Sequence, residues 1–193
     1  MSNHPAATEL VLVRHARSVP PTADGPDELT RPLTPEGLRQ ADELVPVLTE
    51  LRPTTLWSSP YLRAIQTIRP TAAALGLPVH THGRLREWDD GLAYTDDWAP
   101  HCAHSWANPS YARPGGESLE QLRTRAVDTL RTIAHHNHGQ VVLIAGHGTF
   151  ICQALIGFGR PTDQTAAQRM PMPAIYRIRF TDLTAGPEVS ELP

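Results

Sequence analysis

Two short apolar runs constrain the fold more than any other feature of the chain. Val141–Ala145 is apolar throughout, and Glu9–Val13 is apolar after its first residue. An uninterrupted apolar run is typical of a strand that is buried on both faces of a parallel sheet. Weaker strand signals follow at Thr55–Ser58 and Val79–His82, and segments with helical periodicity lie between the strands. Because strands alternate with helices, we predict a mainly parallel α/β sheet.

The first predicted helix begins at Pro35. Thr34 is a favourable N-cap, and proline is preferred at the first helical position. The apolar residues that follow recur at helical spacing: Leu38, Ala41, Leu44, Val45, Leu48 and Leu51. Pro46 lies within this pattern, so we expect it to kink or shift the helix.

Two more helices are delimited by clear end signals. One runs from about Pro60 to Leu75, with Gly76 placed to end it and Pro70 in its interior. Another begins after Ser118, because Ser118 and Gln121 have the spacing of a capping box. This helix continues to the histidine-rich segment 135–138, where cationic or donor side chains suit a helix C-terminus.

The C-terminal part predicts a short helix after Thr149 and a last strand at Ala174–Phe180. In that strand Arg177 and Arg179 alternate with apolar residues, which is the pattern of a half-exposed edge strand. Residues 1–193 contain no internal repeat or interdomain linker. We therefore predict one three-layer α/β/α domain with helices on both faces of the sheet.

Composition narrows the possible functions. A net charge of −3 and a pI near 6.3 argue against a protein that binds nucleic acid or an anionic membrane. No apolar stretch approaches the ~20 residues that cross a bilayer, and the N-terminus lacks the pattern of a secretory signal. Two cysteines make no disulfide framework. These features predict a cytoplasmic protein.

Polar residues follow each predicted strand and indicate a phosphate site. His15 follows the first strand between Arg14 and Arg17. Arg63, Glu87 and His147 follow the second, third and fourth strands, and parallel strands would bring them to one edge of the sheet. Arginines bind phosphate, helix N-termini favour anions, and a neutral imidazole can attack phosphorus.

Four ordered segments resemble the histidine phosphatase superfamily, which includes phosphoglycerate mutases and small phosphatases. Leu12–Ser18 resembles the family's Arg-His-Gly motif, and Ser58–Thr67 its second arginine motif. Leu85–Gly91 is similar to its acid motif, and Gly146–Gly148 to its closing histidine. The resemblance spans nearly the whole chain.

The resemblance implies a phosphohistidine mechanism without a metal or other cofactor. His15 would be the nucleophile and Glu87 the general acid and base. Arg14, Arg63 and His147 would bind the phosphoryl oxygens, and their charges would favour a neutral His15. Further substrate-binding candidates are Ser18, Gly148, Arg17 and Trp88. The implied substrate is a small-molecule phosphate ester.

Departures from the family pattern favour a phosphatase over a mutase. Ala16 replaces the usual glycine, and Arg17 replaces an acid or glutamine. Pro21 stands where mutases commonly carry asparagine, and no long insertion with paired arginines is present. Arg17 could contact substrate or point to solvent. A mutase-like transfer and a non-catalytic sensor of phosphorylated ligands remain alternatives, as does a homodimer.

Residues 88–113 are predicted to select the substrate, as a cover or lid. The aromatic side chains there are Trp88, Tyr94, Trp98, Trp106 and Tyr111, accompanied by four aspartates. Such a cover would suit an uncharged, aromatic or cationic group. Alternatively, the aromatics close the core and the aspartates are solvated. His101, Cys102 and His104 lack the further ligands that a zinc site needs, so we predict no metal.

Overall fold

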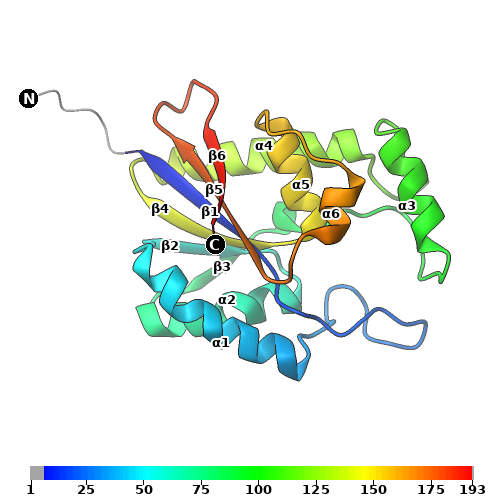
Figure 1. The fold of residues 1–193 in the computed structure, drawn as a ribbon, viewed down its shortest axis with the longest axis horizontal. Coiled ribbons are helices and arrows are strands. Elements are labelled where there is room, and N and C mark those ends of the chain that lie inside the picture. The colour runs from blue at the N-terminus through cyan, green and yellow to red at the C-terminus, as the bar shows by residue number, and fades with distance from the viewer. Residues whose placement is uncertain (1–6, 193) are drawn as a thin grey trace, which may run out of the picture.

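A six-stranded sheet forms the centre of the computed structural model, which describes residues 7–192 (Figure 1). The strands are β1 (Thr8–Arg14), β2 (Thr55–Ser58), β3 (Val79–Thr81), β4 (Val141–Gly146), β5 (Ala174–Phe180) and β6 (Glu188–Leu192). Their order across the sheet is β3-β2-β4-β1-β5-β6. The first four are parallel to one another, whereas β5 and β6 are antiparallel to their neighbours.

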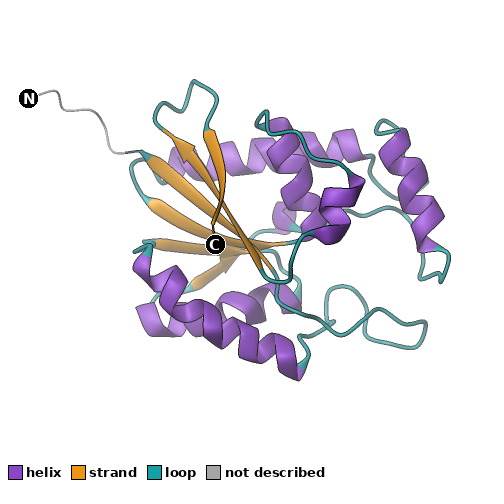
Figure 2. Cartoon of the chain, viewed as in Figure 1, coloured by secondary structure: helices purple, strands orange, loops and turns teal. Residues whose placement is uncertain are grey.

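Helices cover both faces of this sheet, as the purple and orange elements of Figure 2 show. The helices are α1 (Pro35–Glu50), α2 (Leu62–Leu75), α3 (Trp98–Ala107), α4 (Leu119–His136), α5 (Gly148–Gly157) and α6 (Gln164–Arg169), with a short 3₁₀ helix at Gly83–Leu85. Apolar residues of α1 and α2 share one core with Val11 and Val13 of β1. Residues of α4 and α5 share the other core with Leu10 and Leu12. The predicted three-layer α/β/α architecture is confirmed.

The predicted helix ends are confirmed by their hydrogen bonds. Thr34 accepts the backbone N–H of Gly37 at the start of α1. Ser118 and Gln121 form the reciprocal capping box of α4, and Gly76 ends α2 in the left-handed conformation. Helix α1 continues through Pro46, which lies on an exposed face where water can bond the carbonyl left without a partner.

The prediction that Ala174–Phe180 is a half-exposed edge strand is wrong. Strand β6 pairs along β5 and takes the edge position, so β5 lies between β1 and β6. Arg177 and Arg179 project beside Glu9 of β1, with nitrogen–oxygen distances of 3.2 and 3.4 Å. The alternating arginines therefore reflect an ion-pair ladder across neighbouring strands, rather than a free edge.

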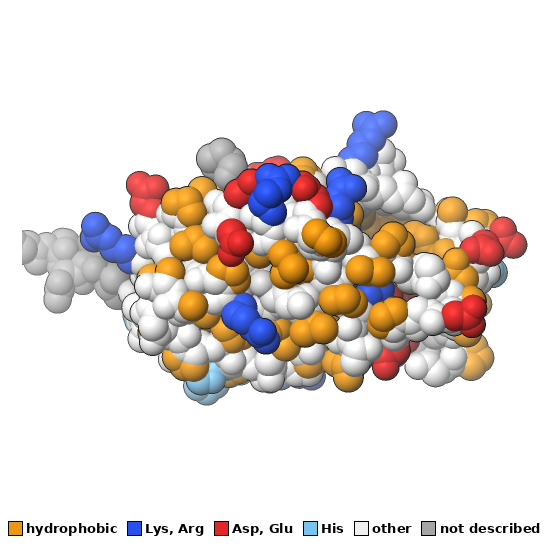
Figure 3. Space-filling view, turned by 90° about the horizontal axis from the view of Figure 1, so that it is seen from below, with side chains coloured by type: hydrophobic (Ala, Val, Ile, Leu, Met, Phe, Trp, Pro, Cys, Tyr) orange, Lys and Arg blue, Asp and Glu red, His pale blue; other side chains and the backbone are white. Residues whose placement is uncertain are grey.

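The side of the molecule formed by α1 and α2 carries scattered hydrophobic side chains among charged ones (Figure 3). Leu38 and Val47 of α1 are 46% and 41% exposed, so Leu38 shares the helical spacing of the apolar residues of α1 without being buried. Among residues 7–192, no helix combines the length and apolar character needed to cross a membrane.

Candidate active site

The register of the sheet brings the two motif histidines together. Arg14 at the end of β1 lies opposite Gly146 at the end of β4, so His15 and His147 leave the sheet at the same level. The backbone N–H of His15 also donates to the Gly146 carbonyl, at 3.0 Å. The centroids of the two imidazole rings are 5.4 Å apart. A single small anion can therefore contact both rings.

The His15 ring is fixed in one tautomer. Its Nδ1 lies 2.8 Å from the carbonyl oxygen of Ala16, which can only accept a hydrogen bond, so Nδ1 carries the proton. The lone pair is then on Nε2. The Ala16 backbone N–H in turn donates to Thr67 of α2, at 3.0 Å. These contacts orient the ring and leave Nε2 without a hydrogen-bond partner among them.

The surroundings of His15 keep its imidazole neutral. Burial, followed by the charge of Arg63, lowers the pKa of His15 to about 3. Arg14 and Arg31 contribute further positive charge. A neutral imidazole at His15 is thus supported, although burial is a larger cause than the neighbouring charges that the sequence indicated.

His147 lies at the N-cap of α5 and is fully buried. Its Nε2 lies 2.7 Å from the hydroxyl oxygen of Ser59, whereas its buried Nδ1 has no hydrogen-bond partner within residues 7–192. The ring of Tyr61 packs edge-on against it, with centroids 4.9 Å apart. Burial, followed by the charge of Arg63, lowers the pKa of His147.

Two of the predicted arginines lie beside these rings. Arg14 donates to the carbonyl of Met170 and packs on Gly148, where an added Cβ would lie 3.1 Å from the Arg14 Cζ and Nε. Arg63 is the second residue of α2 and is 1% exposed. Burial lowers the pKa of both arginines, and the charge of nearby Glu87 opposes this effect. Both side chains stay charged because the pKa of an arginine is so high.

Glu87 lies at the N-terminus of α5. Its two carboxylate oxygens accept the backbone N–H groups of Thr149 and Phe150, at 3.1 and 2.9 Å. It also accepts the N–H of Trp88, at 2.9 Å. Helix N-termini bind carboxylates in this way. The segment that carries Glu87 is thereby bonded to α5, the helix whose N-cap residue is His147.

A third arginine, Arg31, was not among the predicted site residues. Its guanidinium donates to the Ser18 hydroxyl at 2.8 Å and to the Val19 carbonyl at 2.7 Å. It also forms two hydrogen bonds with the carboxylate of Glu28, and Arg63 bonds the same carboxylate. Arg31 and Glu28 lie in a loop rich in proline, aspartate and glycine, where no local pattern marks them. Only the fold brings them to Ser18 and Arg63.

An ion pair that the sequence did not indicate holds the acid motif in place. Arg125 of α4 donates to the backbone carbonyls of Arg84, Arg86 and Glu87 and forms an ion pair with Glu117. Glu117 in turn accepts the indole N–H of Trp88 through its carbonyl, at 2.8 Å.

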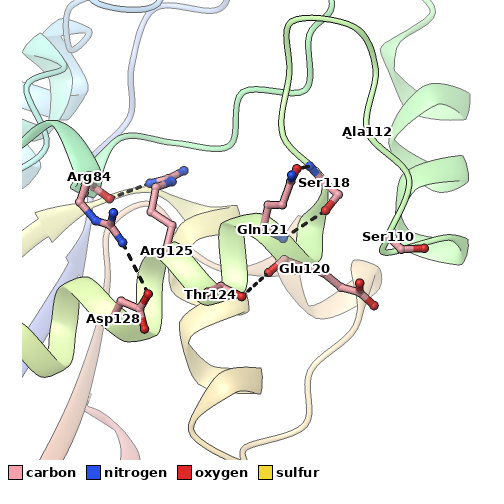
Figure 4. A pocket seen from close by; sticks show the side chains of 9 residues that line it. All are labelled: Arg84, Ser110, Ala112, Ser118, Glu120, Gln121, Thr124, Arg125 and Asp128. Atoms are coloured by element: carbon pink, nitrogen blue, oxygen red, sulfur yellow. Dashed lines mark hydrogen bonds and ion pairs between the residues drawn. The ribbon is translucent and has the colours of Figure 1, made fainter.

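Figure 4 shows Arg125 at the edge of a surface hollow of about 670 Å³ beside α4. The residues that line this hollow include none of the catalytic candidates. The bonds of Arg125 are instead to the backbone of the segment that carries Glu87.

The remaining candidates lie in different surroundings. The Arg17 side chain is exposed. Trp88 packs in the core, and Trp106 packs against it. Tyr94, Trp98 and Tyr111 are 41–47% exposed. Of the five aromatic side chains in residues 88–113, two therefore help to close the core and three remain accessible.

No cluster of three potential metal-ligating side chains occurs within residues 7–192. Cys102 is buried, whereas His101 and His104 on the same helix are exposed, so the three side chains do not face one common site.

Known proteins resemble this chain in sequence. The histidine phosphatase superfamily (branch 1) matches residues 10–187. The chain is 31% identical over 154 residues to a metal-independent phosphoserine phosphatase of Arabidopsis thaliana. That alignment covers 73% of this chain but only 64% of the plant protein.

Solved structures show the same fold. A mycobacterial glucosyl-3-phosphoglycerate phosphatase has a TM-score of 0.76 and 21% identity, with 96% of this chain and 97% of that chain covered. A phosphoserine phosphatase of Entamoeba histolytica, solved as a mutant with phosphoserine, has a TM-score of 0.78 and 18% identity. This match covers 95% of this chain and 96% of the Entamoeba chain.

Proposed function

The chain belongs to branch 1 of the histidine phosphatase superfamily, and on this premise we propose that it hydrolyses a small-molecule phosphate monoester through a phosphohistidine on His15. One observation carries the proposal: His15 presents an unprotonated Nε2 beside a second buried imidazole, the buried Arg63 and the half-buried Arg14. A structural histidine would have both ring nitrogens satisfied. The names of the Arabidopsis and mycobacterial proteins support this class of substrate.

The first step transfers the phosphoryl group to the enzyme. The Nε2 lone pair of His15 forms a bond to phosphorus while the ester P–O bond breaks. The leaving oxygen takes a proton from the protonated carboxyl group of Glu87. The Ala16 carbonyl stabilises the phosphohistidine, because it accepts a hydrogen bond from Nδ1–H as the ring gains positive charge.

The second step returns His15 to its starting form. The Glu87 carboxylate takes a proton from water as the water oxygen attacks phosphorus, and the P–N bond breaks to release inorganic phosphate. In both steps the negative charge on the phosphoryl oxygens is stabilised by Arg14, Arg63 and His147. The two arginines supply the positive charge that a metal ion supplies in other phosphatases, so the reaction needs no metal, whereas the buried His147 is neutral.

We further propose that residues 88–113 contact the alcohol part of the ester. The accessible side chains of Tyr94, Trp98 and Tyr111 lie in this segment. Figure 1 shows this segment and the loop between β1 and α1 extending beyond the same end of the sheet. The segment would select substrates after the phosphate group is bound.

The test is release of inorganic phosphate from 4-nitrophenyl phosphate and from a panel of metabolite monoesters that includes phosphoserine and glucosyl-3-phosphoglycerate. We expect turnover by the wild type and at least about a thousandfold less by His15→Ala. His138→Ala, which changes an exposed histidine in the turn after α4 and outside the site, is the matched control and should retain full activity. Comparable turnover by His15→Ala and the wild type would refute the proposal.

A further inference from the structure

We propose that Glu28 is an internal competitor of the substrate phosphate, and that it sets the affinity of the site for phosphate. The inference deepens the proposed function and rests on it. It concerns a carboxylate that lies on the guanidinium groups to which the phosphoryl group would bind.

Glu28 bonds two arginines at once. Its Oε2 accepts from Arg63 at 2.8 Å, and its backbone carbonyl accepts from the other terminal nitrogen of Arg63 at 2.7 Å. The carboxylate also accepts from Nε and Nη2 of Arg31, at 3.0 and 2.9 Å. A carboxylate and a phosphate both prefer this bidentate geometry on a guanidinium group. Both terminal nitrogens of Arg63 are therefore engaged by one acidic residue.

The charge on Glu28 is maintained by these contacts. Burial alone would raise the pKa of Glu28, but the hydrogen bond from Arg31 and the charges of Arg63 and Arg31 outweigh it. The pKa of Glu28 is thus held below its ordinary value, and the carboxylate is ionised at neutral pH. A phosphate dianion that approaches Arg63 meets this negative charge.

The exposure of the partners shows which one can move. The Glu28 side chain is 51% exposed, whereas that of Arg63 is 2% exposed. Arg31 keeps its bonds to Ser18 and Val19 when the carboxylate leaves. The backbone next to Glu28 is held in place by α2, because the Leu29 carbonyl accepts the N–H of Leu62 at 2.9 Å. Glu28 can therefore turn its carboxylate to solvent by side-chain rotation alone, which exchanges one anion for another.

The alternative role is that of a fixed support, in which Glu28 orients Arg31 and Arg63 for phosphate. The two roles predict opposite effects of the same variants. Removing a competitor tightens phosphate binding, whereas removing a support weakens it.

The experiment is calorimetric titration of the wild type, Glu28→Gln and Glu28→Ala with inorganic phosphate and with orthovanadate. Because a partly exposed ion pair is weak, we expect about fivefold tighter phosphate binding in Glu28→Gln and Glu28→Ala. The KM for 4-nitrophenyl phosphate should fall with it, and inhibition by product phosphate should increase.

Asp24→Asn is the matched control, because it removes one charge from the same exposed loop without disturbing the arginines. Its phosphate affinity should equal that of the wild type. Unchanged or weaker phosphate binding in both Glu28 variants would overturn the inference, as would an equal gain in Asp24→Asn. If the wild type binds phosphate but hydrolyses no ester, the proposed function fails, while the titrations still decide the role of Glu28.

Discussion

Replacing His15 by asparagine should make the protein less sensitive to acid. The structure holds His15 as a buried neutral imidazole with a pKa of about 3, compared with an ordinary value of 6.5. At a pH between these two pKa values, the His15 side chain is protonated in the unfolded chain and unprotonated in the folded chain. His15 therefore lowers the free energy of unfolding as the pH falls below about 6.5, and this loss is complete near pH 3.

The size of the effect follows from the two pKa values. A pH of 5 is about 1.5 units below the pKa of His15 in the unfolded chain, so the imidazole is almost fully protonated there. In the folded chain the imidazole is almost fully unprotonated at this pH. Each unit is worth about 1.4 kcal/mol, so His15 lowers the free energy of unfolding by about 2 kcal/mol between pH 8 and pH 5. Asparagine cannot take up this proton. The acid sensitivity of His15→Asn should be smaller by the same amount.

Urea unfolding at pH 8 and pH 5 measures this difference directly. The free energy of unfolding should fall between the two pH values by about 2 kcal/mol more in the wild type than in His15→Asn. His101→Asn, which replaces an exposed histidine, should behave as the wild type does. Equal acid sensitivity of the wild type and His15→Asn would refute a buried neutral imidazole, and with it the argument for a ready nucleophile.

Three further predictions concern the surroundings of the reacting groups. Glu117→Gln breaks the buried ion pair with Arg125 and should lower the free energy of unfolding by about 3 kcal/mol. The same variant should lose kcat, and the loss should be larger for phenyl phosphate than for 4-nitrophenyl phosphate. The reason is that the poorer leaving group depends more on the proton of Glu87, whose backbone carbonyl Arg125 holds. An equal loss for both esters would show that the pair does not position Glu87. Gly148→Ala places a Cβ 3.1 Å from the Arg14 guanidinium, and phosphate binding measured by calorimetry should weaken about tenfold. The free energy of unfolding should change by under about 1 kcal/mol. Unchanged phosphate binding would place Arg14 outside the phosphate site. Dialysis against EDTA should leave turnover unchanged, since arginines supply the positive charge; loss of activity that Mg²⁺ restores would contradict this.

Local sequence patterns predicted the parts of the fold that local physics determines. The capping box at Ser118, the N-cap at Thr34 and the left-handed glycine at Gly76 each depend on residues a few positions apart. The uninterrupted apolar run Val141–Ala145 identified a central strand. Strand β6, Glu188–Leu192, was missed because a short edge strand with mostly exposed side chains has no strong pattern of its own.

The candidate site was predictable to the extent that its residues follow strands. The order of the parallel strands brings His15 and His147 to one edge. The supporting contacts were not predictable, because they join residues distant in sequence: Ser59 with His147, Arg125 with the backbone at Glu87, and Arg31 with Ser18. An arginine in a loop or on a helix face gives no local sign of the carbonyl or hydroxyl that it will meet.

The most direct test of the account is to trap the phosphorylated enzyme. Wild-type protein would be mixed with a phosphate monoester, quenched in alkali after a few milliseconds, digested and analysed by mass spectrometry for a peptide that carries an added phosphoryl group. We expect a phosphoryl group on Nε2 of His15, absent in His15→Ala and longer-lived in Glu87→Gln. Hydrolysis that proceeds at full rate with no phosphoryl group on His15, or with the group on another residue, would contradict it.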